Sequence, residues 1–153
     1  EIMLRLTPAH VRAAVDAGAY TDTRTTEYMV ETLLARQRKL GRWALGRVAP
    51  ITNVSATDAT LCFDDLWLRH DFGLPSTTRY ALVTYDYAGK RIGATAMVAT
   101  GTRTCLPMRP GIERDAYTIA RVEVRRNGRA LPVAFVHLAK GPKGMRVVGI
   151  DRR

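Results

Sequence analysis

The chain has 153 residues, of which 46% are hydrophobic, and it carries a formal net charge of +10. This length is enough for one domain with a core of its own, or for a small helical unit followed by a β domain. The sequence contains no run of about 18 consecutive apolar residues, so it predicts no transmembrane helix.

Only four of the 24 basic residues are lysines, and the arginines are spread over the whole chain. A surface for nucleic acid or anionic lipid is one interpretation of this charge. We favour the other, an ordinary basic surface in a protein from a GC-rich bacterial source. The chain begins Glu1-Ile2-Met3 without an initiator methionine, so we expect a fragment of a longer protein, and its cellular localisation stays open.

Residues 7–18 are expected to form a short helix. Thr7 is a suitable N-cap, and Pro8 suits the first helical position, where a missing N–H costs nothing. Gly18 is expected to end the helix in the left-handed conformation.

A longer helix is predicted from Thr23 to Val48, with Asp22 as its N-cap. Its apolar residues recur at spacings of three and four, which forms one stripe, and Gln37 interrupts that stripe. The stripe consists of Met29, Val30, Leu33, Leu34, Leu40, Ala44, Leu45 and Val48.

The rest of this helix surface is the most basic part of the chain. It carries Arg36, Arg38, Lys39 and Arg42. A solvated helix face is the interpretation we favour, because cations near a helix C-terminus meet the negative end of its dipole. A face that binds phosphate groups is the alternative.

Pro50 is expected to end the helical part, and the composition of residues 50–58 predicts a linker. Beyond this segment the apolar period changes from that of a helix to that of a strand. We therefore expect a helical segment at 1–49, a linker at 50–58 and an antiparallel β domain at 59–153.

The β domain is predicted to begin with a strand in residues 59–70, where Leu61 and Phe63 point inward. The pair Asp64-Asp65 is interpreted as a β-bulge, because the inward phase shifts by one residue across it. Residues 79–87 and 91–100 predict a hairpin.

Residues 101–114 predict the longest irregular segment, and such segments often carry function. It contributes three further candidates for anion binding, Arg103, Arg109 and Arg114. Cys105 is placed in this loop, whereas Cys62 is interpreted as a buried residue of a strand. A disulfide between the two cysteines requires the fold to bring them together, which spacing alone does not show.

Residues 117–153 predict a three-strand meander. The first strand alternates up to Asn127-Gly128, a strong signal for a type I′ turn. A second strand is expected from Leu131 to Leu138, and a third from Met145 to Ile150. The whole pattern predicts an α+β fold, with a helical pair followed by an antiparallel, sandwich-like domain of about six strands.

The sequence contains no motif of nucleophilic hydrolysis or phosphate binding. The three histidines, His10, His70 and His137, lie on different predicted elements. The best candidate cluster for a metal ion, at residues 64, 65, 70 and 71, has no recognised ligand spacing. We therefore predict no catalytic residue, no metal site and no cofactor.

The helical portion, LTPAHVRAAVDAGAYTD followed by RTTEYMVETLLARQRKLGRWALGRVAP, resembles a segment of large uncharacterised bacterial proteins. In those proteins the segment follows a HipA-like or phosphoinositide-kinase-like region and precedes a β-rich C-terminal region. The resemblance covers the first third of the chain. It implies a C-terminal position in such a protein and transfers no activity, because the kinase motifs are not in this sequence.

Three functions follow as expectations. The leading one is a non-catalytic accessory or interaction module that packs on a preceding domain of the same polypeptide or on a protein partner. The second is a domain that binds anionic ligands, such as nucleic acid or phosphate. The third is a small metal-dependent hydrolase built on Asp64, Asp65 and His70.

Overall fold

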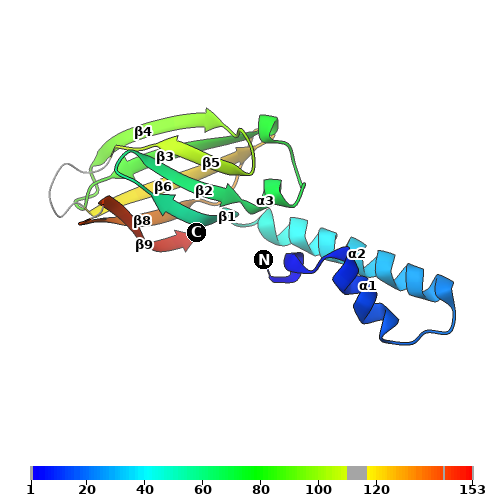
Figure 1. The fold of residues 1–153 in the computed structure, drawn as a ribbon. Helices are drawn as coiled ribbons and strands as arrows, with labels where there is room; N and C mark the ends of the chain where they lie inside the picture. Colours follow the sequence, from blue (N-terminus) through cyan, green and yellow to red (C-terminus); the bar gives the residue numbers. More distant parts are fainter. Residues whose placement is uncertain (1, 110–116, 143, 153) are drawn as a thin grey trace. The chain divides into compact units, whose positions relative to one another are not determined.

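The computed structural model describes residues 2–109, 117–142 and 144–152. The chain forms two compact units, residues 1–44 and residues 45–153. Three α-helices and nine strands in two sheets lie in the described part of the chain (Figure 1). The α+β class is as predicted, whereas the number of strands is higher than expected.

The helical unit contains the 3₁₀-helix η1 (Ile2–Arg5) and the helices α1 (Pro8–Asp16) and α2 (Thr23–Leu45). The predicted cap of α1 is confirmed: Thr7 Oγ1 accepts a hydrogen bond from His10 N, and His10 Nδ1 accepts one from Thr7 N. The prediction for Gly18 is wrong, because Ala19 takes the positive φ, at 47°.

Helix α2 begins as predicted and ends earlier. Asp22 Oδ1 accepts a hydrogen bond from Arg24 N at 2.9 Å, which is the expected N-cap contact. The helix ends at Leu45, three residues before the predicted Val48. No helix in the described part of the chain has the length and apolarity to cross a membrane.

The smaller sheet of the β unit is antiparallel, with strand order β1-β2-β5. Two sequence predictions are wrong here. The segment 50–58, expected to be a linker, contains β1, and the segment 101–114, expected to be irregular, contains β5. Both are short outer strands with polar alternate residues, and among the described residues each pairs with β2 alone. The strands are β1 (Ile51–Ala56), β2 (Thr60–Asp65) and β5 (Arg103–Pro107).

The pair Asp64-Asp65 is not a bulge. Strand β2 ends at Asp65, which caps the short helix α3 (Leu66–Arg69). Asp65 Oδ1 accepts hydrogen bonds from Trp67 N at 2.8 Å and Leu68 N at 3.3 Å. The apparent change of phase was therefore the transition from a strand to a helix. A 3₁₀-helix, η2 (Pro75–Thr77), follows before the larger sheet begins.

The larger sheet is antiparallel, with strand order β4-β3-β6-β8-β9, and β7 pairs with β6. The Asn127-Gly128 turn is confirmed, with φ values of 47° and 79°, both positive as a type I′ turn requires. The strands are β3 (Thr78–Tyr85), β4 (Arg91–Val98), β6 (Tyr117–Arg126), β7 (Arg129–Ala130), β8 (Ala134–Gly141) and β9 (Gly144–Arg152).

The two sheets share one apolar core, an arrangement consistent with the predicted sandwich. Leu61 and Phe63 of β2 point into it, as predicted, and both are fully buried. The Phe63 ring meets the Tyr80 ring of β3 edge to face, with centroids 5.0 Å apart. The alternate residues of β3, β6 and β8 complete the core.

Cys62 and Cys105 form a disulfide. They lie directly opposite each other in the register of β2 and β5. The predictions of a buried Cys62 and a loop position for Cys105 are wrong, because Cys62 is half-buried and Cys105 is an exposed residue of a strand. The disulfide links the two strands on the outer side of the smaller sheet.

Candidate functional site

The helical unit contains a groove, and the side chain of Gln37 on α2 connects the segments that form it. Its Nε2 donates hydrogen bonds to the carbonyl oxygens of Met3 at 2.7 Å and Leu6 at 2.9 Å. These two carbonyls belong to η1 and the turn that follows it, so one amide fixes that segment against α2. In the sequence Gln37 looked like a defect of the apolar stripe, and its role as a connector was missed.

Helix α1 is connected to α2 by a second contact. The Arg12 guanidinium donates to both carboxylate oxygens of Glu27, at 2.9 and 2.7 Å. This two-point contact holds the pKa of the Glu27 carboxyl below its ordinary value. The pair is bidentate and half exposed, and it links the two helices at their surface.

The segments so connected enclose an open cavity of about 360 Å³. Its apolar lining includes large side chains that remain exposed: Leu6 at 51%, Leu33 at 39% and Leu40 at 47%. The lining residues are Met3, Leu6, His10, Val11, Ala14, Leu33, Arg36, Gln37 and Leu40. We refer to this cavity as the helical groove.

Of the predicted basic face of α2, one member lines the helical groove, namely Arg36. Lys39, three residues after Arg36, is its neighbour on the helix surface, whereas Arg42, six residues after Arg36, lies about 120° away around the helix axis. Arg38 lies four residues before Arg42, and all four cations are exposed. Arg36 is therefore the member of the basic face that borders the groove, whereas Arg38 and Arg42 lie on the other side of α2.

The predicted arginines of the 101–114 segment have different environments. Arg103 donates to Asp64 at 2.9 Å and to Ser55 Oγ at 3.0 Å, so it connects the three strands of the smaller sheet. Arg109 lines a cavity between the two sheets. Arg114 lies outside the described residues. Arg103 and Arg109 belong to the β unit and the other described candidates to the helical unit, so the predicted set is not one cluster within either unit.

The carboxylates considered for a hydrolase are engaged in structural contacts. Asp65 is fully buried, and besides its two backbone donors it accepts hydrogen bonds from Tyr80 Oη at 2.6 Å and from Arg126. Burial, together with the negative charge of Asp65, raises the pKa of the Tyr80 phenol. In the described part of the chain no three histidine, cysteine, aspartate or glutamate side chains are grouped to hold a metal ion.

Asp64 points to the other face of β2. Asn53 Nδ2 donates to it at 2.8 Å, and Arg103 donates from the opposite side. These two hydrogen bonds, Asn53 first, hold the pKa of the Asp64 carboxyl below its ordinary value. Asp64 and Asp65 therefore do not converge on one site, as expected of neighbours at the end of a strand.

His137, which had no identified partner in the sequence, lies on the outer face of the larger sheet. Its Nδ1 is 2.6 Å from the Tyr117 hydroxyl of β6. With Tyr85, Ile119, Phe135 and Asp151 it lines a shallow hollow of about 330 Å³. The register of β6 and β8 brings Tyr117 and His137 together, and only the structure gives that register.

Comparison of the chain with protein-family models, with curated proteins and with solved structures found no match. The resemblance of the first third of the chain to large bacterial proteins therefore stays a prediction.

Proposed function

We propose that this chain is a non-catalytic interaction module whose helical groove binds an apolar helical segment of a partner protein. The observation that carries the proposal is the exposure of Leu6, Leu33 and Leu40 along one preformed groove. A contiguous exposed apolar surface of this kind is typical of a binding site, because leaving it in water is unfavourable.

Two polar groups of the groove are already engaged in hydrogen bonds within the chain, which favours an apolar occupant. Both hydrogens of the Gln37 amide are already donated to backbone carbonyls. His10 Nδ1 is occupied by the cap of α1. Few polar groups in the groove thus remain for recognition, so binding would depend on burial of aliphatic side chains.

The charges beside the groove indicate the chemistry of the partner's flanks. Arg36 lines the groove, and Lys39 lies next to Arg36 on the surface of α2. An amphipathic helix with leucines on one face and glutamates beside them would match both features. This is the helix-in-groove mode of recognition, in which apolar anchors supply affinity and charges fix the orientation.

The test uses two synthetic helical peptides with the same leucines, one flanked by glutamates and one by lysines. Binding to the full chain is followed by fluorescence anisotropy of a dye on the peptide. We expect the glutamate peptide to bind more tightly, and Leu33→Glu or Leu40→Glu to weaken it by about tenfold or more, as loss of an interface anchor does. Equal affinity of the two peptides would contradict the charge assignment.

A matched control is Leu74→Glu, since Leu74 is a similarly exposed leucine, at 63%, in the β unit. This variant should bind the glutamate peptide as the unmodified chain does. If Leu33→Glu binds equally well while retaining its helix content by circular dichroism, the groove is not the binding site.

The second candidate, binding of an anionic ligand, is favoured by the exposed cations of α2. It predicts retention on heparin that falls as salt rises and that decreases in Arg38→Glu. Retention that does not depend on salt would exclude an electrostatic mechanism. This measurement separates the two candidates, because the peptide assay depends on leucines and heparin contains none.

A further inference from the structure

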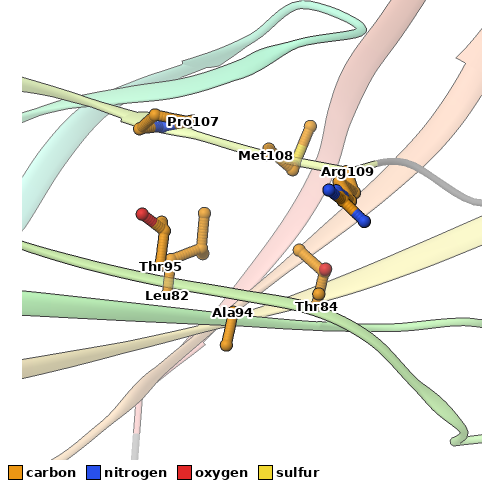
Figure 2. Close-up of a pocket in the computed structure, with 8 residues that line it drawn as sticks. Leu82, Thr84, Ala94, Thr95, Pro107, Met108 and Arg109 are labelled. Carbon is orange, nitrogen blue, oxygen red and sulfur yellow. The ribbon is translucent and has the colours of Figure 1, made fainter.

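A cavity of about 330 Å³ lies between the two sheets of the β unit. Strands β3 and β4 form one wall, and Pro107, Met108 and Arg109, at and beyond the end of β5, form the other (Figure 2). Strands β4 and β5 are each the outermost strand of their sheet, so the cavity opens where two sheet edges meet. This site belongs to the β unit alone and is independent of the helical groove.

Thr84 is the first indication that the cavity is built for a ligand. It lies on the inner face of β3 and is only 2% exposed. Its Oγ1 is buried and has no hydrogen-bond partner among the described residues. Figure 2 shows this side chain pointing into the cavity. A buried hydroxyl without a partner is unfavourable, and a ligand oxygen within the cavity would satisfy it.

Gly93 keeps the space next to this hydroxyl free. It lies opposite Thr84 in the register of β3 and β4. A Cβ at this position would be 2.9 Å from Thr84 Oγ1, closer than atoms normally pack, and 3.4 Å from Arg109 Cβ. The space between Thr84 and Arg109 therefore depends on the missing side chain of Gly93.

The lining of the cavity combines apolar walls with a single charge. Leu82, Met108 and Pro107 supply the walls, while Thr84 and Thr95 supply hydroxyl groups. Arg109, one of the arginines singled out in the sequence, is the only charged residue in this described lining, and in Figure 2 it lies on the wall opposite Thr84. The cavity thus offers hydrogen-bond donors and one positive charge at one end of an apolar space.

We infer that this cavity binds a small aliphatic carboxylate. The carboxylate would accept hydrogen bonds from the Arg109 guanidinium and from the Thr84 hydroxyl, and the alkyl part would lie against Leu82 and Met108. The volume is at the lower end of the range for small-molecule sites, about 300–1,000 Å³, so the ligand is small. The absence of acidic groups from this described lining leaves the carboxylate without a repelling neighbour.

The test is a titration of the full chain with hexanoate, followed by NMR of the methyl groups of Leu82 and Met108. Hexanamide, which has the same shape and no charge, is titrated in parallel. We expect saturable shifts with hexanoate, and weaker binding of hexanamide by about tenfold, the value of one charge-assisted contact. Equal affinity for the two compounds, or the absence of any shift at these methyl groups with hexanoate, would overturn the proposal.

Three variants locate the site. Arg109→Gln should weaken hexanoate binding by about tenfold and leave hexanamide unchanged. Thr84→Val removes the hydroxyl at nearly constant shape and should weaken hexanoate with the fold retained. Gly93→Ala should prevent binding by filling the space. The control is Arg91→Gln, which changes an exposed arginine of β4 outside the cavity and should have no effect.

Each variant is first checked for an unchanged NMR spectrum away from the cavity. If a folded Arg109→Gln variant binds hexanoate as the unmodified chain does, the charge assignment is wrong. Thr84→Val serves as a second variant if Gly93→Ala proves unfolded, because it removes a buried unpaired hydroxyl and is not expected to destabilise the core.

Discussion

Arg126 donates a hydrogen bond to the carboxylate of Asp65 inside the β unit, where the two side chains are 8% and 0% exposed. The Arg126 guanidinium also lies over the indole ring of Trp67, 5.1 Å from its centroid. This contact connects the end of β6 with the junction of β2 and α3. Two buried charges compensate each other there, so the loss of one leaves the other without a counter-charge.

We expect Arg126→Met to destabilise the protein by about 3–5 kcal/mol, since it leaves the buried Asp65 carboxylate without its cation. Urea unfolding of the purified variant measures the change in the free energy of unfolding. The double variant Asp65→Asn, Arg126→Met should recover part of the loss, because no buried charge then remains.

The neighbouring Arg125→Met is the control, because Arg125 points to the exposed face of the same strand. Its effect should stay within about 0.5 kcal/mol, as for most surface substitutions. Equal effects of the two substitutions would show that burial of the Asp65–Arg126 pair does not determine its contribution.

Most strands of the larger sheet could be predicted from the sequence, whereas two of the three strands of the smaller sheet could not. Strands β3 and β6 alternate over 8 and 10 residues, and the turn at Asn127-Gly128 fixes the hairpin that follows β6. Strands β1 and β5 are shorter, with polar alternate residues and a proline in β5. Their pairing with β2 depends on contacts distant in sequence, which local alternation does not reveal.

The candidate sites depended even more on tertiary structure. The arginines of α2 were found from the sequence, whereas the groove that Arg36 lines requires the contact of Gln37 with Met3 and Leu6. The alternation along β3 is enough to place Thr84 on the same face as Tyr80 and Leu82. That its hydroxyl is buried without a partner follows only from the position of the segment after β5. A sequence pattern predicts on which face of a helix or strand a residue lies. The groups that this face contacts depend on the packing of segments distant in sequence.

The Asp64 carboxylate gives a prediction for acid stability. Its hydrogen bonds from Asn53 and Arg103 lower its pKa in the folded state. The contribution of such a group is complete above its unfolded pKa, ordinarily 3.8, and is lost as the pH falls through the lower folded value. We expect Asp64→Asn to lower the Tm at neutral pH. The difference in Tm between this variant and the unmodified chain should become smaller as the pH falls below 3.8, the ordinary pKa of the carboxyl.

Thermal unfolding of both proteins from about pH 7 to about pH 2.5 tests this dependence. The pair with Arg103 is partly exposed, so its contribution should be less than about 1 kcal/mol. Asp16→Asn, an exposed substitution at the end of α1, controls for general charge effects. A difference between Asp64→Asn and the unmodified chain that stays constant with pH would contradict the assignment.

The disulfide between Cys62 and Cys105 should contribute substantially to stability. It closes a loop with a sequence separation of 43, for which the chain-entropy relation gives about 4 kcal/mol. We expect the double variant Cys62→Ala, Cys105→Ala to lose an amount of this order in urea unfolding. Thiol titration of the unfolded, unreduced chain should detect no free thiol, and a full count of two would contradict the disulfide.

Gln37 provides a prediction that separates folding from binding in the helical unit. Gln37→Ala removes both hydrogen bonds to the carbonyls of Met3 and Leu6, while alanine favours the helical conformation of α2. We therefore expect faster hydrogen exchange in residues 3–6, unchanged helix content in α2 and loss of the glutamate peptide's binding. Glu31→Ala, an exposed substitution on the same helix, should change none of these quantities. Retained peptide binding in a Gln37→Ala protein whose N-terminal segment exchanges freely would show that η1 is not part of the binding surface.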